Sequence, residues 1–342
     1  MNNFSINWPS GKTDFIFGDF SEIIRKYLPN RKLIFICDER LIEIYPEISN
    51  YYPLIKITAN EENKTLRWVE SIYQKLIEFE ADKQTVIVSI GGGIISDIAG
   101  FLASTFYRGM SLVLIPTTLL AMIDAAIGGK NGLNYGHHKN QIGTIRQPEK
   151  IIIDTRFLKT LPSEQIKSGM AEVIKHAVIS GKDLFGEFQK LDNIVQWKQG
   201  IFEDEWINKV MHIKIKIVLE DELDNGNRRI LNFGHTLGHI IEMQEKISHG
   251  EAVSLGMMMA AKLSVYLKKC DQKTVDQLAT ALSLFDLPIK SNCNIQNIIS
   301  RLESDKKKVG KDIDYILMED IGHVVIKRIP IEKIKKLLLE VF

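Results

Sequence analysis

Three histidines and a glutamate have the types and spacing needed to hold a metal ion. His235 and His239 are four positions apart, which puts them on one face of a helix, and His249 follows ten positions later. Glu172 stands upstream, three positions before Lys175 in an apolar helical segment. Catalytic zinc commonly takes three protein ligands and keeps one position open. Glu172 and two histidines would meet that need and leave the third for proton transfer, whereas a core histidine pair satisfied by backbone is the competing interpretation.

A run of three glycines, Gly91–Gly93, separates a buried apolar run from a helical pattern. Glycine lets the backbone approach a pyrophosphate, and the amino terminus of the following helix supplies free N–H groups and a positive dipole. The run does not match the G-x-G-x-x-G fingerprint of dinucleotide-binding proteins. A tight turn without a ligand is its alternative interpretation.

Cationic and amide side chains gather in a glycine-rich stretch further along the chain. Gly128-Gly129-Lys130 is followed by Lys139-Asn140. Lysine and asparagine beside glycine turns suit a phosphate or a carboxylate. Each lysine alone is typical of a solvated surface, but their convergence favours an anion site.

The first 160 residues predict an α/β architecture that would position these groups. Short apolar runs, typical of fully buried strands, alternate with turns and with an amphipathic helix at Leu66–Phe79. The predicted strands are Leu33–Cys37, Thr85–Ile90, Ser111–Ile115 and Ile151–Asp154. Strands that alternate with helices imply a parallel sheet in a Rossmann-like arrangement.

The pattern becomes mostly helical after about residue 160. The predicted helices are Glu164–Ile179, Trp206–Glu220, Arg229–Glu245, Glu251–Lys268, Thr274–Phe285 and Ile331–Phe342. Weaker strand-like segments lie at Ile313–Met318 and His323–Ile326. We therefore expect two domains, residues 1–160 and residues 161–342.

Composition narrows the classes of function. The chain has 44 basic and 43 acidic residues, so no overall charge recruits nucleic acid or an anionic membrane, and an anionic substrate needs a local cluster of cations. The amino terminus lacks the features of a signal peptide, and the apolar stretch Leu112–Ile127 is too interrupted to span a membrane. Cys37, Cys270 and Cys293 have no paired spacing, which indicates a reducing compartment. These features predict a cytoplasmic protein.

Nine segments, in matching order and spacing over most of the chain, resemble the 3-dehydroquinate synthases, a family of sugar-phosphate cyclases. They are GGGIISDIAGF, YRG, IPTTLLAMIDAAIGGK, HKNQIG, TLP, GMAEVIKH, RRILNFGHTLGHIIE, SHGEAV and DKKKVG. The resemblance implies a Rossmann-like NAD-binding domain in residues 1–160 and a mostly helical, metal- and substrate-binding domain in residues 161–342. It also implies conversion of 3-deoxy-D-arabino-heptulosonate 7-phosphate to 3-dehydroquinate and phosphate in the shikimate pathway, by a homodimer that uses NAD and Zn²⁺ or Co²⁺.

The resemblance further assigns roles to individual residues. The metal ligands that it implies are Glu172, His235 and His249. The catalytic residues that it implies around the reacting ring are His239, Lys175, Lys214, Asn232 and Asp124. The substrate-binding residues that it implies are Arg228 for the carboxylate and, for the phosphate, Lys130, Asn140, Lys306, Lys307 and Arg108 of a neighbouring subunit. The NAD-binding residues that it implies are Asp38, Glu61, Lys64, Gly91, Gly92, Gly93, Asp97, Thr117, Thr118, Asp124, Lys130 and Lys139.

The reaction implied by the resemblance runs in several steps in one pocket. Zinc polarises a substrate hydroxyl, NAD takes a hydride, and phosphate is eliminated from the resulting ketone. NADH then returns the hydride, the sugar ring opens, and an intramolecular aldol reaction closes the carbocycle. The protein supplies binding, orientation and electrostatics, and NAD is regenerated in each turnover.

Departures from the family's pattern leave other substrates open. Ala125 and Ala126 replace two serines, Asn131 follows Lys130 where a smaller residue is usual, and Asp224 shortens an acidic segment. A sister cyclase that forms an aminodehydroquinate, an inosose or a valiolone is one alternative, and the arginine for the substrate carboxylate argues against the two that lack that group. A metal-dependent polyol dehydrogenase, which would release NADH, is another. A nucleotide-binding scaffold without catalysis would have no need of the metal ligands.

Overall fold

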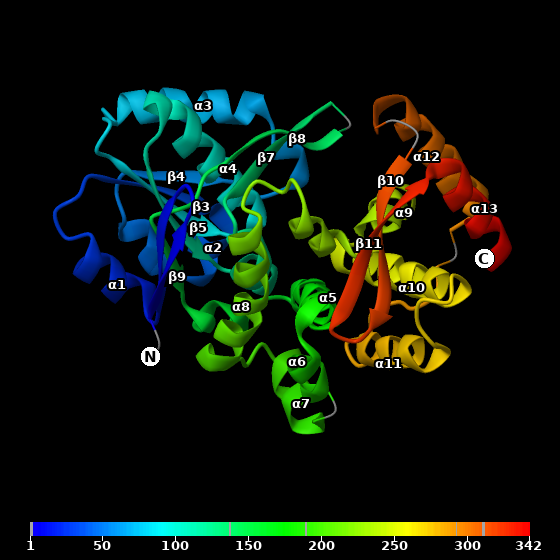
Figure 1. The fold of residues 1–342 in the computed structure, drawn as a ribbon. Helices are drawn as coiled ribbons and strands as arrows, with labels where there is room; N and C mark the ends of the chain where they lie inside the picture. Colours follow the sequence, from blue (N-terminus) through cyan, green and yellow to red (C-terminus); the bar gives the residue numbers. More distant parts are fainter. Residues whose placement is uncertain (1–2, 137, 189, 292, 310–311) are drawn as a thin grey trace. The chain divides into compact units, whose positions relative to one another are not determined.

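The structure, a computed structural model, describes residues 3–136, 138–188, 190–291, 293–309 and 312–342 (Figure 1). The chain divides into two compact units. Met1–Pro162 and Gly200–Ile215 form the amino-terminal unit, and Ser163–Gln199 and Lys216–Phe342 form the carboxy-terminal unit. Helix α8 (Asp204–Glu220) contributes residues to both.

A seven-stranded sheet is the framework of the amino-terminal unit, with strand order β1-β2-β9-β6-β5-β3-β4. The strands are β1 (Phe4–Trp8), β2 (Gly11–Phe17), β3 (Leu33–Asp38), β4 (Leu54–Ile57), β5 (Val86–Gly91), β6 (Ser111–Pro116) and β9 (Lys150–Ile153). Neighbouring strands pair in parallel, except that β1 is antiparallel to β2. Every residue of β5 is buried, as expected for a central strand of a parallel sheet covered on both faces.

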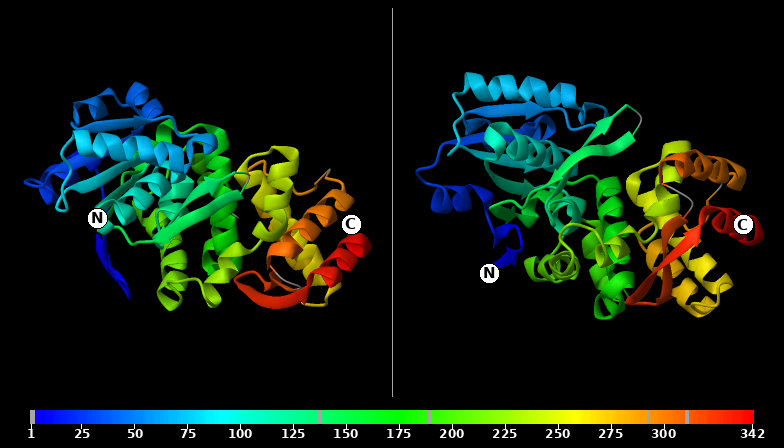
Figure 2. Two further views of the ribbon diagram at one scale, coloured as in Figure 1. Left: turned by 90° about the horizontal axis from the view of Figure 1, so that it is seen from above. Right: turned by 45° about the horizontal axis from the view of Figure 1, so that its top comes forward.

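Helices and a separate hairpin surround this sheet. The helices are α1 (Phe20–Tyr27), α2 (Glu39–Ile44), α3 (Leu66–Glu78) and α4 (Gly93–Thr105), with short helical turns at Pro46–Asn50, Glu61–Asn63, Phe106–Arg108, Ala121–Ala125 and Thr155–Thr160. Helix α4 packs on β5 and β6 and also on β7 (Lys130–Tyr135), which forms a two-stranded ribbon with β8 (His138–Ile145) (Figure 2). The sheet therefore positions α4, and α4 in turn supports the lysine-bearing hairpin.

Helices make up most of the carboxy-terminal unit. They are α5 (Ser163–Ser180), α6 (Lys182–Glu187), α7 (Leu191–Lys198), α9 (His235–Glu245), α10 (His249–Tyr266), α11 (Gln272–Ser283), α12 (Ile295–Val309) and α13 (Ile331–Val341), with a short turn at Asn227–Asn232. Strands β10 (Asp312–Asp320) and β11 (His323–Pro330) form an antiparallel pair. The mostly buried α10 packs against α5, α9 and α11, so it is the central helix of this unit. No helix in the described part of the chain is long and apolar enough to cross a membrane.

The predicted fold class is confirmed, and the four predicted strands agree with the structure to within one residue at each end. The predicted helix Arg229–Glu245 is wrong at its beginning. The structure has a short turn at Asn227–Asn232, and α9 begins only at His235 because Gly234 adopts a left-handed backbone conformation with φ of 81°. The hairpins β1–β2 and β7–β8 were not predicted.

Candidate metal and cofactor sites

Glu172, His235 and His249 each bring a donor atom into one cluster of the carboxy-terminal unit. The donor atoms of the three residues all lie within 4.8 Å of one another. Glu172 Oε1 is 3.3 Å from His235 Nε2 and 3.1 Å from His249 Nε2. One carboxylate and two imidazoles are a donor set that suits zinc or cobalt. The structure thus brings together the three residues whose role as ligands the sequence predicts.

Glycines determine how closely the helices that carry these donors approach one another. A Cβ atom at Gly256 of α10 would lie 1.8 Å from the carbonyl oxygen of Gly234, next to His235. A Cβ atom at Gly250 would lie 2.4 Å from Ser168 Cα of α5, about one turn before the cluster's glutamate. Side-chain carbons cannot approach backbone atoms this closely, so only glycine permits this arrangement of α5, α9 and α10.

The charge of Glu172 is maintained by its cationic neighbours. The residue is 1 % exposed, and its carboxylate forms a close ion pair with Lys175, which is itself buried. Burial alone would raise the pKa of Glu172, but Lys175 and His235 hold that pKa well below its usual value. Burial would lower the pKa of His249, yet hydrogen bonding to Glu172 and Glu242 raises it to about 9. The cluster therefore contains an ionised carboxylate, which is the form that binds a cation.

The outer nitrogen of each histidine has a second polar neighbour. His235 Nδ1 is 3.2 Å from the carbonyl oxygen of Phe233, and His249 Nδ1 is 3.7 Å from Glu242 Oε2. Such partners orient the ring of a metal-binding histidine. The exposed ring of His239 lies beside the cluster, with its centroid 5.2 Å from that of His235. The proton-transfer role of His239 stays a prediction.

The glycine run forms the amino terminus of α4. Gly92 is the N-cap residue, and no described side chain caps this helix. A Cβ atom at Gly92 would lie 3.1 Å from Thr118 Cγ2, and one at Gly93 would lie 3.3 Å from Ala125 Cβ. The first N–H groups of a helix have no partner within the helix, and this terminus lacks a capping side chain, so it fits an anionic group such as a pyrophosphate.

Residues predicted for NAD and for phosphate belong to one hydrogen-bonded network. Lys64 is 4 % exposed, pairs with Asp97, and donates from Nζ to Asn140 Oδ1 at 2.5 Å. Asn134 donates to Glu61 Oε1 at 2.9 Å and accepts from the backbone N–H of Asn140 at 2.9 Å. The sequence did not single out Asn134, because it has no charge and lies far along the chain from Glu61.

Three further predicted residues have well-defined partners in the amino-terminal unit. Lys214, buried on α8, lies 2.9 Å from Asp124 Oδ1 and also donates to the Asp124 carbonyl oxygen at 2.7 Å. Asp38, at the end of β3, caps α2 and binds the guanidinium of Arg40 through both oxygens. Thr117 is buried beside the glycine run, where its N–H donates to the Gly91 carbonyl oxygen at 3.0 Å.

Arg228 is held in place by the loop that follows α8. It is 2 % exposed, and its Nη1 donates to the carbonyl oxygen of Glu222 at 2.5 Å. The Asp221 carboxylate accepts backbone N–H groups of Asn225, Gly226 and Arg228 at 2.9, 2.7 and 3.0 Å. Asp221 thus organises the loop that carries Arg228, the residue predicted to bind the substrate carboxylate. The Asn225-Gly226 pair is the turn signal that could have revealed this role.

The other predicted residues are on the surface or outside the described side chains. Lys130, Lys139 and Asn232 are exposed, the first two on the β7–β8 hairpin. Arg108 is also exposed, in a turn with φ of 60°. Lys306 and Lys307 belong to α12, but their side chains lie outside the part of the chain that the structure describes.

The unusual residue Asn131 has a role in the fold. Its side chain is buried, donates to the Gly129 carbonyl oxygen at 3.3 Å, and accepts from Thr144 Oγ1 at 2.9 Å. The amide therefore ties the glycine turn to β8. The nearby Ser96 hydroxyl is buried with no hydrogen-bond partner among the described residues.

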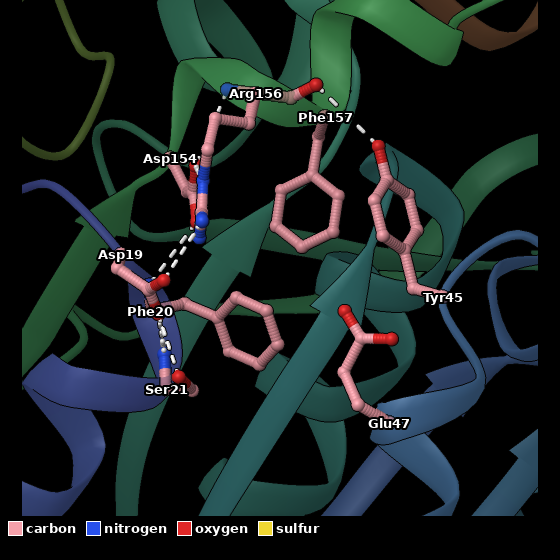
Figure 3. A pocket seen from close by; sticks show the side chains of 8 residues that line it. All are labelled: Asp19, Phe20, Ser21, Tyr45, Glu47, Asp154, Arg156 and Phe157. Carbon is pink, nitrogen blue, oxygen red and sulfur yellow. Dashed lines mark hydrogen bonds and ion pairs between the residues drawn. The ribbon is translucent and has the colours of Figure 1, made fainter.

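A cavity of about 120 Å³ lies in another part of the amino-terminal unit (Figure 3). It is lined by Asp19, Phe20, Ser21, Tyr45, Glu47, Asp154, Arg156 and Phe157. The guanidinium of Arg156 bridges Asp154 and Asp19, with a 2.8 Å contact to Asp19 Oδ2. None of the residues predicted for chemistry lines this cavity, so we assign it no part in the candidate sites.

Two family models match consecutive parts of the chain. The model for the 3-dehydroquinate synthase N-terminal region matches residues 54–168, and the model for the C-terminal region matches residues 169–308. A 3-dehydroquinate synthase of Pyrococcus abyssi is 38% identical over 305 residues, which are 89% of each chain. One of Clostridium acetobutylicum is 36% identical over 341 residues, covering 96% of this chain and 94% of the relative.

Solved structures give a consistent result. A 2-deoxy-scyllo-inosose synthase complexed with carbaglucose-6-phosphate, NAD⁺ and Co²⁺ superposes with a TM-score of 0.86 at 27% identity, over 100% of both chains. A probable glycerol dehydrogenase from Sinorhizobium meliloti has a TM-score of 0.66 at 14% identity, over 99% of this chain and 97% of its own. At that identity the second likeness shows the fold alone.

Proposed function

Because this chain belongs to the 3-dehydroquinate synthase family, we propose that it converts 3-deoxy-D-arabino-heptulosonate 7-phosphate to 3-dehydroquinate and phosphate. The observation that carries the proposal is the cluster of Glu172, His235 and His249, all with donor atoms within 4.8 Å, beside the buried Lys175. A chain of this family that retains this donor set retains the metal-binding residues that the family's reaction needs.

We assign NAD to residues 1–160 and the metal and substrate to residues 161–342. The uncapped amino terminus of α4 after Gly91–Gly93 fits the pyrophosphate of NAD, and the ionised Glu172 with two imidazoles fits Zn²⁺ or Co²⁺. When bound, NAD supplies a reversible oxidation and the metal makes a substrate hydroxyl more acidic.

The residues of the chain bind, orient and exchange protons. The Arg228 fork suits the substrate carboxylate, since a guanidinium can donate two parallel hydrogen bonds to it. Lys130 and Asn140 would hold the phosphate by donating hydrogen bonds to its oxygens. His239, exposed beside the metal cluster, would receive and return the proton of a substrate hydroxyl.

A sister cyclase that acts on a sugar phosphate without a carboxylate is the competing function. Ala125 and Ala126 support it, because they remove two hydroxyls that the family usually has. Arg228 opposes it, since a guanidinium suits a substrate carboxylate and a substrate without that group would have no need of it. The higher identity to 3-dehydroquinate synthases, 38% against 27% for the inosose synthase, agrees with the acid substrate.

The test is an assay with 3-deoxy-D-arabino-heptulosonate 7-phosphate, catalytic NAD and Zn²⁺. We expect inorganic phosphate and dehydroquinate to appear in equal amounts, with no lasting NADH absorbance. Glucose 6-phosphate, which has no carboxylate, is the matched control and should release none. Phosphate release from the control alone would identify a sister cyclase. NADH accumulation on simple polyols would identify a dehydrogenase. NAD binding without turnover would identify a nucleotide-binding scaffold.

We also propose a homodimer in which Arg108 of one subunit serves the phosphate site of the other. The Arg108 side chain is exposed, and the structure gives it no ion pair or hydrogen bond among the described residues. Tyr107 and Arg108 both adopt left-handed backbone conformations, with φ of 50° and 60°. Backbone strain of this kind clusters at functional sites, which supports a functional role for this exposed arginine.

The cytoplasm is the location that we propose for the protein. Its cysteines Cys37, Cys270 and Cys293 are free thiols in the structure. Free thiols are typical of proteins in reducing compartments.

A further inference from the structure

We propose that Glu242 is a positioning residue that orients His249 for the metal. Its carboxylate would accept the Nδ1–H of His249, so that the other ring nitrogen, Nε2, is presented to the metal beside Glu172. The inference rests on the proposed function, because it requires a metal at the cluster of Glu172, His235 and His249. Glu242 is not one of the ligands that the sequence predicts.

The imidazole of His249 lies between two carboxylates from different helices. Nε2 is 3.1 Å from Glu172 Oε1 of α5, and Nδ1 is 3.7 Å from Glu242 Oε2 of α9. The side chain of Glu242 is 13% exposed and that of Glu172 is 1% exposed, so both carboxylates act in partly or wholly dry surroundings. Each ring nitrogen therefore has one acidic neighbour of its own.

With a metal bound at Nε2, Glu242 would determine the tautomer of His249. A metal can use the lone pair of Nε2 only when the ring proton is on Nδ1, and an acceptor facing Nδ1 stabilises that proton there. A carboxylate acceptor also increases the basicity of the ring and fixes its orientation. His235 has the equivalent support from a backbone oxygen, that of Phe233 at 3.2 Å. Both imidazoles of the cluster thus have an outer acceptor, and only that of His249 is a side chain that substitution can remove.

A second group of donors gives the competing explanation. His239, Glu242 and His249 also have donor atoms within 4.8 Å of one another, so Glu242 could be a direct ligand there. That group would use a different carboxylate, and Glu172 would then lie outside the metal site. The geometry of Glu172 favours the first group, because this buried carboxylate has its Oε1 atom 3.3 Å from His235 Nε2 and 3.1 Å from His249 Nε2. The two explanations predict different effects of substituting Glu172.

The test measures zinc affinity of the metal-free full-length protein by competition with a chromophoric chelator. We expect Glu242→Ala to weaken zinc binding by roughly 10- to 100-fold, the range for lost outer partners of metal ligands. Glu242→Gln keeps an acceptor without the charge, so its loss should be smaller. Glu245→Ala removes the same charge from the same helix and should leave the affinity unchanged. The Co²⁺ absorption spectrum of Glu242→Ala should keep the form that it has in the parent protein, because no ligand is lost.

Several outcomes would overturn the inference. An affinity of Glu242→Ala within about twofold of the parent protein would do so, and so would an equal loss in Glu245→Ala. Abolished binding in Glu242→Ala with intact binding in Glu172→Ala would make Glu242 a ligand. Intact binding in Glu172→Ala and in His235→Ala would instead refute the metal site of the proposed function. If thermal melting shows that Glu242→Ala does not fold, the zinc affinities of Glu242→Gln and Glu245→Gln are compared instead.

Discussion

At the scale of single residues, the candidate sites consist of buried charges that are held by specific partners. Glu172 pairs with Lys175, and Lys64 pairs with Asp97, although burial raises the pKa of Asp97. Arg228 is fixed by a backbone carbonyl oxygen. Buried charges are costly unless they are paired, so a chain that concentrates them in a few places has a functional reason to do so.

Arg228→Lys tests the carboxylate-binding role. Lysine keeps the charge but loses the two-pronged contact, so we expect the KM for the acid substrate to rise by roughly 10- to 100-fold, the equivalent of the 1.5–3 kcal/mol of a hydrogen bond to a charged group. The kcat should change much less. Arg229→Lys, at the neighbouring position where the arginine pairs with Asp314, is the control and should leave both constants unchanged. A fall in kcat at constant KM would contradict the assignment.

Asp19→Asn tests a charge outside the site. Burial raises the pKa of Asp19, but hydrogen bonds from Ser21 and Arg156 lower it to about 2. A lowered pKa stabilises the fold above the unfolded pKa of about 4, and that stability is lost as the pH falls toward 2. Because both side chains are partly exposed, we expect a loss of about 1 kcal/mol or less at pH 7, shrinking below pH 4. Urea unfolding of both proteins at several pH values measures this difference in the free energy of unfolding. A pH-independent difference would show that the loss does not come from the charge, since the substituted amide can still cap α1.

At the scale of secondary-structure elements, close contacts at glycine assemble the metal cluster. Gly256→Ala would place a carbon 1.8 Å from the Gly234 carbonyl oxygen, so α9 and α10 must separate. We expect the free energy of unfolding to fall by about 1–3 kcal/mol or more, and zinc affinity to fall with it. Gly186→Ala is the control, because a Cβ atom there meets nothing within 4 Å and should raise stability by about 0.5 kcal/mol. Equal zinc affinities in the two variants would show that this contact does not position the donors.

The sequence predicted those elements whose pattern is set by burial alone. Strands such as Val86–Gly91 are continuous apolar runs because both faces of the sheet are covered. The β7–β8 hairpin was missed because its strand His138–Ile145 is largely exposed and has no apolar run. The network through Asn134 and the loop role of Asp221 were missed for another reason, since they depend on which residues the fold brings together. The donors Glu172, His235 and His249 were found from family motifs, and the facing carboxylate Glu242 was not.

At the scale of the whole molecule, the two units carry different parts of the proposed chemistry. The glycine turn and the network of Lys64 and Asp97 belong to the amino-terminal unit, whereas the metal cluster and Arg228 belong to the carboxy-terminal unit. The two matched family models likewise cover consecutive regions, residues 54–168 and 169–308. A reaction that needs both NAD and a metal therefore depends on both units, and the proposed dimer adds a residue from a second chain.

The dimer proposal is tested by mixing two inactive variants. Activity returns in their heterodimer only if a residue of one subunit serves the site of the other. An Arg108→Ala chain lacks its arginine but has intact metal donors, and a His235→Ala chain has the reverse. Each homodimer should be nearly inactive. A heterodimer isolated with two affinity tags restores one complete site out of two, so we expect about half of the parent activity per dimer. The control heterodimer pairs His235→Ala with Glu172→Ala, whose lesions lie in one cluster, and should stay inactive because neither subunit has an intact metal site. Inactivity of the first heterodimer would mean that Arg108 serves its own subunit.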